Sequence, residues 1–199
     1  MKNIEKELKE FYGDNLLGID YPCKINDQYI FLRTFISKPD GTTIKVEILQ
    51  NMKLIYDTDT INGIRLISTK DIAVFKLISA SSRLAKKDIY DLNYITDNNN
   101  LIELFKDLAT KQERYNSEED KTIFDLDGKV NPIQNPHLLL DFDNPKQGKS
   151  SRPNHSNDLI ETVPNSKTWI TTGIEWRAKM RSLYRHLELD FPKPKGRSV

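Results

Sequence analysis

Apolar and polar positions alternate along two neighbouring stretches, residues 28–37 and 43–49. In the first stretch both alternating sets are largely apolar, which is typical of a strand that is covered on both faces. Residues 38–41 read Lys-Pro-Asp-Gly, a strong turn signal. We therefore expect an antiparallel hairpin, with Lys45 and Glu47 on the same face of its second strand.

Apolar residues at helical spacing predict three amphipathic helices, at residues 4–11, 101–112 and 169–187. Gly13 would end the first of them. A short apolar run at residues 64–67 predicts one more strand.

Charged residues recur inside the apolar stretch that follows this run. Ser68 or Thr69 is a suitable helix cap, and Asp71 would then lie in the first turn, where a carboxylate complements the positive helix end. We favour this capping role for Asp71 over a catalytic one. Lys76 lies among core-forming residues, where a lysine often extends its amine to water. Arg83 follows seven residues later, on the same face if the helix continues.

A second helical stretch carries Asp88 and Asp91, three residues apart and therefore on one face. One interpretation is structural: Arg83 and Lys87 pair with the two aspartates and fix one helix against the next. The other is functional: Asp88 completes a polar cleft that faces Glu47. The spacing of these charged residues does not distinguish the structural from the functional interpretation. For Glu47 the structural alternative is a cross-strand ion pair on a solvated face.

These residues together resemble the later motifs of the AbiEii/AbiGii-type nucleotidyltransferase toxins of abortive-infection systems. The family motifs are Lys-x-Asp on a strand, Asp-x-x-x-x-Lys, and Arg followed by Lys-Asp-x-x-Asp-Leu. The matching positions are Lys45 and Glu47, then Asp71 and Lys76, then Arg83, Lys87, Asp88, Asp91 and Leu92. Glu47 stands where the family usually has Asp, and the resemblance covers roughly the first half of the chain.

The family's first motif, a Gly-Ser pair followed by Asp-x-Asp, is absent, and the chain begins close to where that motif would end. In the family this motif holds the metal ions and the nucleotide phosphates. A single carboxylate cannot hold two Mg²⁺ ions, which need several oxygen ligands each. Two hypotheses follow. The chain is a toxin whose first motif lies on an upstream segment or a partner chain, or it is a degenerate, non-catalytic relative that acts as a binding or regulatory module.

The resemblance implies transfer of a nucleotide from an NTP to a nucleic-acid or protein hydroxyl, assisted by Mg²⁺. Glu47 would be the third metal-binding carboxylate or a base, and Asp88 would support the cleft or act as a base. Lys76 would contact phosphate. Three further basic residues would bind substrate: Lys45, Arg83 and Lys87. Two aspartates would be structural: Asp71 and Asp91. The implied partners are an NTP, an RNA acceptor such as tRNA, and an antitoxin or completing protein chain.

Composition narrows the class of protein. The 199 residues carry 30 Lys and Arg against 29 Asp and Glu, so the net charge of +1 gives no overall field that attracts nucleic acid. There is one cysteine, the N-terminus has no apolar signal region, and no apolar run reaches the ~20 residues that span a bilayer. We expect a cytoplasmic protein with no membrane association.

The fold class that these elements predict is α+β, with a small, mainly antiparallel sheet packed by helices, similar to a nucleotidyltransferase core. Residues 1–97 would form this core, and residues 98–199 a helical and irregular C-terminal region. Asn-Pro steps interrupt the chain from residue 131 on, and Leu138–Leu140 offers the apolar anchor there. The basic helix at 169–187 and the tail at 192–197 would touch RNA phosphates or, as we favour, form a solvated face.

Overall fold

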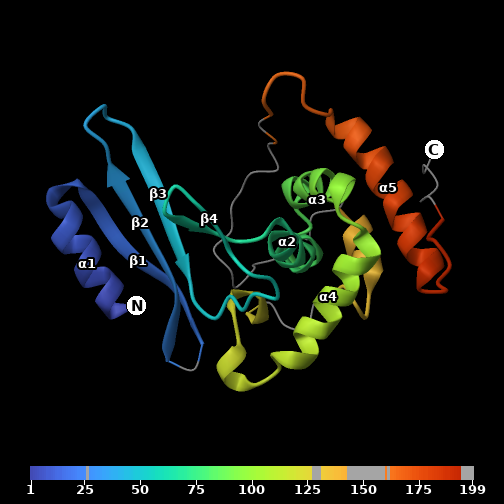
Figure 1. Cartoon of the computed structure of the whole chain (residues 1–199), viewed down its shortest axis with the longest axis horizontal. Helices are drawn as coiled ribbons and strands as arrows, with labels where there is room; N and C mark the ends of the chain where they lie inside the picture. Colours follow the sequence, from blue (N-terminus) through green and yellow to red (C-terminus); the bar gives the residue numbers. More distant parts are fainter. Residues whose placement is uncertain (26, 127–130, 143–159, 161, 194–199) are drawn as a thin grey trace, which may run out of the picture. The chain divides into compact units, whose positions relative to one another are not determined.

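The computed structural model describes residues 1–25, 27–126, 131–142, 160 and 162–193 (Figure 1). Within these residues the α+β prediction is confirmed: five α-helices accompany a three-stranded antiparallel sheet and a two-stranded one. The chain divides into two units. Unit 1 holds Met1–Lys53 and residues 116–126, and unit 2 holds Leu54–Tyr115 and the described residues from 131 on. Each unit is described by itself.

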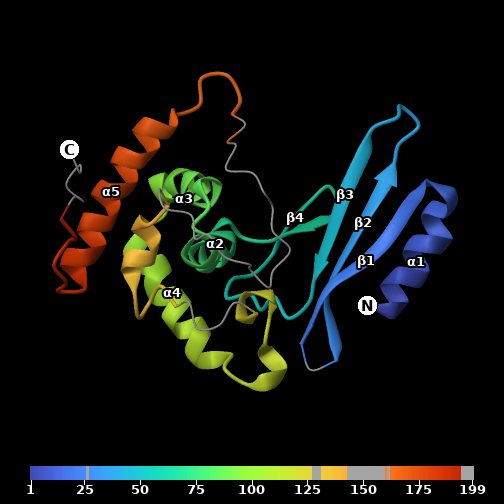
Figure 2. The same cartoon turned by 180° about the vertical axis from the view of Figure 1, so that it is seen from behind.

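Unit 1 is built on a sheet of three antiparallel strands in the order β1 (Leu16–Ile25), β2 (Gln28–Ser37) and β3 (Thr43–Leu49). Helix α1 (Lys2–Tyr12) lies along the sheet beside β1, as both views show (Figures 1 and 2). The sequence pattern predicted β2 and β3 and their antiparallel pairing, and all three are confirmed. One face of β2 is buried along its length, at Ile30, Leu32, Thr34 and Ile36. On the other face Phe31 is buried but Phe35 is 40% exposed, so the expected cover on both faces holds only in part.

Strand β1 was not predicted from the sequence. Its pairing with β2 shifts register three times, so its residues do not keep a simple alternation of buried and exposed positions. Gly18 has a φ of +137°, which favours glycine, and its carbonyl accepts a hydrogen bond from the Thr34 hydroxyl. These irregularities remove the period-two pattern by which a strand is recognised in a sequence.

Unit 2 begins with a hairpin of β4 (Asp59–Ile61) and β5 (Ile64–Leu66). Asn62 and Gly63 connect the two strands with φ values of 52° and 78°, as the favoured two-residue hairpin turn requires. Four helices follow: α2 (Thr69–Arg83), α3 (Lys86–Asn98), α4 (Leu101–Arg114) and α5 (Trp169–His186). A short 3₁₀ turn at Pro136–Leu140 also belongs to unit 2, whereas those at Gly13–Asn15, Glu118–Asp120 and Ile123–Asp125 belong to unit 1.

The core of unit 2 lies where these helices meet. Trp176 of α5 is fully buried and donates its indole N–H to the carbonyl of Leu139 at 2.8 Å. Leu139 is itself fully buried and belongs to the apolar anchor expected within the irregular segment. Leu104 and Leu108 of α4 complete this part of the core from the face predicted by their spacing. The largest aromatic side chain thus fixes the irregular segment to the C-terminal helix.

No helix among the described residues has the length and hydropathy needed to cross a bilayer. The basic tail from residue 194 on, and the stretch 143–159 with two of the Pro interruptions, lie outside the described residues.

Candidate functional site

Four charged side chains meet where α2 passes into α3. Asp88 is fully buried and accepts hydrogen bonds from Nη2 of Arg83 at 2.7 and 2.8 Å and from Nζ of Lys76 at 3.0 Å. Lys76 also donates to Asp91. We call Lys76, Arg83, Asp88 and Asp91 the α2–α3 cluster. The sequence analysis assigned Lys76, Arg83 and Asp88 to a catalytic or binding site, and Asp91 to a structural role. The structure brings all four side chains together.

The turn between the two helices positions the cluster. Leu84 ends α2 in the left-handed conformation, with a φ of 54°, and its N–H bonds to the carbonyl of Ala80 at 3.0 Å. Helix α3 then begins two residues later, so Arg83 in the last turn of α2 lies next to Asp88 in the first turn of α3. A carboxylate at a helix start and a cation at a helix end both complement the helix dipoles.

The charges of the cluster offset one another. Burial lowers the pKa of Lys76, but the neighbouring charge of Asp88 and the hydrogen bond that Lys76 donates to Asp91 outweigh it, so the net shift is upward. The side chains of Lys76 and Arg83 are 26% and 22% exposed, and that of Asp91 is 45% exposed. The buried Nε of Arg83 has no hydrogen-bond partner among the described residues. The cluster therefore has a buried carboxylate at its base and two cations that reach solvent.

Asp71 lies elsewhere in unit 2. It is fully buried, and its carboxylate accepts hydrogen bonds from the backbone N–H groups of Ile55 and Tyr56 at 2.8 and 3.0 Å. Ser68 caps α2 by accepting from the Asp71 N–H, and its hydroxyl donates back to the carboxylate. This arrangement holds the loop before β4 to the start of α2. Lys87 takes no part in the cluster's hydrogen bonds within the described residues.

Glu47 and Lys45 belong to unit 1. Glu47 Oε1 accepts from Nε of Arg33 on the adjacent strand at 3.0 Å and lies 3.2 Å from Nζ of Lys45. This geometry is the cross-strand ion pair that was one of the two alternatives for Glu47. Because Lys76 and Asp88 belong to unit 2, the convergence of Glu47 with them stays a prediction.

The fit of each candidate carboxylate to Mg²⁺ depends on the cations around it. Glu47 and Asp88 are each bound by two basic side chains. Within the described part of the chain, no three or more His, Cys, Asp or Glu side chains gather as metal ligands would. Mg²⁺ needs several oxygen ligands in near-octahedral geometry. The described carboxylates, as they stand, do not fit that ion.

Lys111 is a residue that the sequence analysis missed. It lies in the last turn of α4, is buried, and places Nζ 3.7 Å from the ring centroid of Phe75. Its amine has no hydrogen-bond partner among the described residues. Burial lowers the pKa of Lys111 to about 8, against the opposing effect of the Asp71 charge. The sequence does contain a signal for the burial of Lys111, because position 111 continues the apolar stripe of Leu104 and Leu108 at helical spacing.

A second polar network, also missed, connects α3 with α5. Lys167 lies 2.6 Å from Asp97 and 2.7 Å from Glu175, and Lys179 lies 2.7 Å from Asp97. Burial raises the pKa of Asp97, but the hydrogen bonds and charges of the two lysines lower it more. Asp97 is separated from Lys167 by 70 positions and from Lys179 by 82 positions in the sequence, so no local pattern indicates these two pairs. The network fixes α5 to α3.

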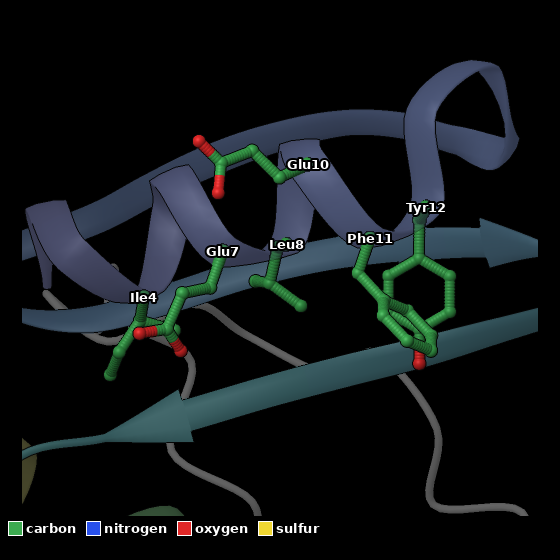
Figure 3. A pocket seen from close by; sticks show the side chains of 6 residues that line it. All are labelled: Ile4, Glu7, Leu8, Glu10, Phe11 and Tyr12. Carbon is green, nitrogen blue, oxygen red and sulfur yellow. The ribbon is translucent and has the colours of Figure 1, made fainter.

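The surface of α1 carries a shallow pocket (Figure 3). Six residues of this one helix line it: Ile4, Glu7, Leu8, Glu10, Phe11 and Tyr12. Phe11 is 82% exposed, and no residue of α1 is buried. The lining contains two carboxylates and no basic side chain, so the pocket does not suit a phosphate group.

Comparisons with protein-family models, with curated proteins and with solved structures find no match to this chain.

Proposed function

We propose that this chain is a nucleotidyltransferase-like toxin of a toxin–antitoxin or abortive-infection system. In this reaction an acceptor hydroxyl of a nucleic acid or protein attacks the α-phosphorus of an NTP, and pyrophosphate leaves. The observation that carries the proposal is the α2–α3 cluster. Two cations that reach solvent, Lys76 and Arg83, are held in place by a fully buried carboxylate, Asp88.

The proposed role of the cluster is to bind the triphosphate. A lysine amine on a flexible stem and an arginine fork are the two side chains that most often bind phosphate. Asp88 accepts hydrogen bonds from both side chains and so fixes their orientation. The half-exposed Asp91 is the second partner of the Lys76 amine. An incoming phosphate oxygen would replace Asp91 as the partner of Lys76.

Mg²⁺ would neutralise the triphosphate and activate the acceptor oxygen when bound. It would need carboxylates in addition to Glu47 and Asp88, supplied by a further segment or by a completing protein chain. The residues of this chain would bind and orient the NTP. Bulk tRNA is the acceptor to try first, and an antitoxin would block the reaction.

A second candidate, a non-catalytic binding or regulatory module, is favoured by one observation. Glu47 and Asp88 are each already bound by two basic side chains, as carboxylates with structural roles are. Such a module would bind its partner without transferring a nucleotide.

Transfer of label from an NTP to bulk tRNA separates the two candidates. The purified chain is incubated with labelled NTP, Mg²⁺ and tRNA, with and without extract of the source cell as a supply of a completing protein chain. The label that the same extract gives without the chain is subtracted. We expect labelled tRNA in at least one condition, and its loss in Glu47→Gln. Glu103→Gln, the same change at an exposed position of α4, is the matched control and should keep the activity. Absence of label in both conditions favours the binding module.

A further inference from the structure

Strand β3 is an edge of the three-stranded sheet in unit 1 (Figures 1 and 2). Among the described strands it pairs with β2 alone. Ile44 and Leu49 on this strand are 42% and 37% exposed, and the side chain of Lys45 is 40% exposed. An exposed, regular edge strand of this length readily pairs with another strand.

The outward backbone groups of β3 can be identified. The N–H of Gln50 bonds to the carbonyl of Ile30 on β2, and the carbonyl of Thr42 accepts from Lys38 at the other end of the hairpin. The register between β2 and β3 is unbroken, so even-numbered residues direct their N–H and C=O groups toward β2. Odd-numbered residues, Lys45 and Glu47 among them, therefore direct these groups away from the sheet.

The sequence of β3 is complementary to itself. It reads Ile44-Lys45-Val46-Glu47-Ile48 around its centre. An antiparallel copy related by a two-fold axis at Val46 places Lys45 opposite Glu47 of the other copy, and Ile44 opposite Ile48. Lys45 and Glu47 are then a hydrogen-bonded pair, which exchanges two backbone hydrogen bonds through groups that already point outward.

The charges select this register over its neighbours. An axis at Lys45 would place the two Lys45 side chains opposite each other, and an axis at Glu47 would do the same for the two Glu47 side chains. Like charges directly opposite destabilise a strand pair, whereas opposite charges stabilise it. The axis at Val46 is the one that converts both like-charge pairs into Lys–Glu pairs. It also extends the apolar face of Ile44, Val46 and Ile48 across both copies.

We infer that the chain forms a two-fold dimer through β3, in which two copies join their sheets edge to edge with Lys45 of each opposite Glu47 of the other. The occupant of the edge is a second copy of this chain, because the charge pattern of β3 complements itself. Each copy presents the same strand, so the contact closes on itself and does not continue into a filament. The internal bonds of Glu47 to Arg33 and Lys45 hold the carboxylate in place on the strand.

Two single charge reversals test the dimer. In Lys45→Glu each copy places glutamates opposite glutamates, and in Glu47→Lys each places lysines opposite lysines. We expect the unmodified chain to dimerise, and each variant to have a dimer dissociation constant that is raised about tenfold or more. The masses are measured by light scattering on a size-exclusion column and by sedimentation over a range of concentrations.

Mixing the two variants gives the sharper result. A copy of Lys45→Glu and a copy of Glu47→Lys place glutamate opposite lysine at both positions, so the mixture should form a heterodimer, detected by native mass spectrometry. Lys38→Glu makes the same charge change in the exposed turn outside β3 and should leave the dimer intact. Lys45→Pro removes an outward N–H without touching the pairing with β2. This variant should be folded by circular dichroism and monomeric by light scattering.

A wild-type chain that stays monomeric at all concentrations would overturn the inference. A dimer that survives both single reversals, or a mixture that contains no heterodimer, would overturn it as well. None of these measurements depends on nucleotide, so they are independent of the proposed function.

Discussion

The two carboxylates expected to act together, Glu47 and Asp88, are each bound by two cations but differ in their surroundings. Glu47 lies on a strand face with a side chain that is 28% exposed, and Asp88 lies at a helix junction with no exposed surface. Removing a partner from a buried ion pair leaves an uncompensated charge, which is costly, whereas an exposed pair contributes little. The comparison teaches that similar pairing in a structure can have very different energetic consequences.

The largest expected effect is that of Asp88→Ala. It would leave Nη2 of Arg83, which donates to both oxygens of this carboxylate, without its buried acceptor. We expect the free energy of unfolding to fall by about 2–3 kcal/mol, less than for a fully buried pair, because the two cations that remain are partly exposed. Chemical denaturation monitored by circular dichroism measures this change. A loss similar to that of Glu47→Gln would show that burial does not distinguish the two carboxylates.

Lys111 extends the comparison to a buried charge that has no ion-pair partner among the described residues. Its folded-state pKa of about 8 lies below the ordinary value of 10.5, so folding disfavours its protonated form. The free energy of unfolding should therefore rise as the pH increases from about 8 to 10.5, and the full penalty is present below pH 8.

Lys111→Met tests this sign. Methionine keeps a similar length without the charge, and we expect it to raise the free energy of unfolding at pH 7 by about 1–3 kcal/mol. Its advantage over the wild type should shrink between pH 8 and 10.5. Lys106→Met on the same helix, where the lysine is exposed, is the control and should change the stability little. A variant that is less stable than the wild type at pH 7 would contradict the buried-charge explanation.

Ser68→Ala tests an uncharged contact near the same helix. It removes the cap of α2 and one hydrogen bond to the buried Asp71, and should cost about 1 kcal/mol. Thermal unfolding measures the loss. A cost as large as that of Asp88→Ala would mean that hydrogen bonds, more than buried charge, hold α2 in place.

The smallest expected effect is that of Glu47→Gln. Because its partners are partly exposed, the free energy of unfolding should change by less than about 1 kcal/mol. The same variant removes the carboxylate required by the transfer assay. A stable fold together with a lost activity would therefore assign Glu47 to function, and a marked loss of stability would assign it to structure.

Much of the fold could be predicted because its signals are local. The alternation in β2 and β3, the turn between them and the Ser68 cap are all carried by consecutive residues, and the structure confirms each. The sequence analysis expected Arg83 and Lys87 to pair with the aspartates of the next helix. The structure shows Arg83 on Asp88, but among the described residues the second cation is Lys76 and not Lys87. Strand β1 escaped because its bulges break the alternation.

The burial of Lys111 and the network of Asp97, Lys167 and Lys179 could not be predicted in full. They depend on which helix packs on which, and the partners are joined only after folding. For the same reason the sequence does not show whether Glu47 and Asp88 converge, and the two residues belong to different units. A sequence indicates what a residue can bond to nearby, but distant partners depend on tertiary packing.

Titration of an NTP into the protein, followed by calorimetry, tests the central claim that the α2–α3 cluster binds triphosphate. We expect binding by the wild type and by Lys106→Met, weaker binding by Lys76→Met, and stronger binding by Asp91→Asn, which frees the amine of Lys76. The circular dichroism spectra of all four proteins serve as the check on folding. Equal NTP affinity in the wild type, Lys76→Met and Asp91→Asn, or no binding by any of them, would contradict the claim.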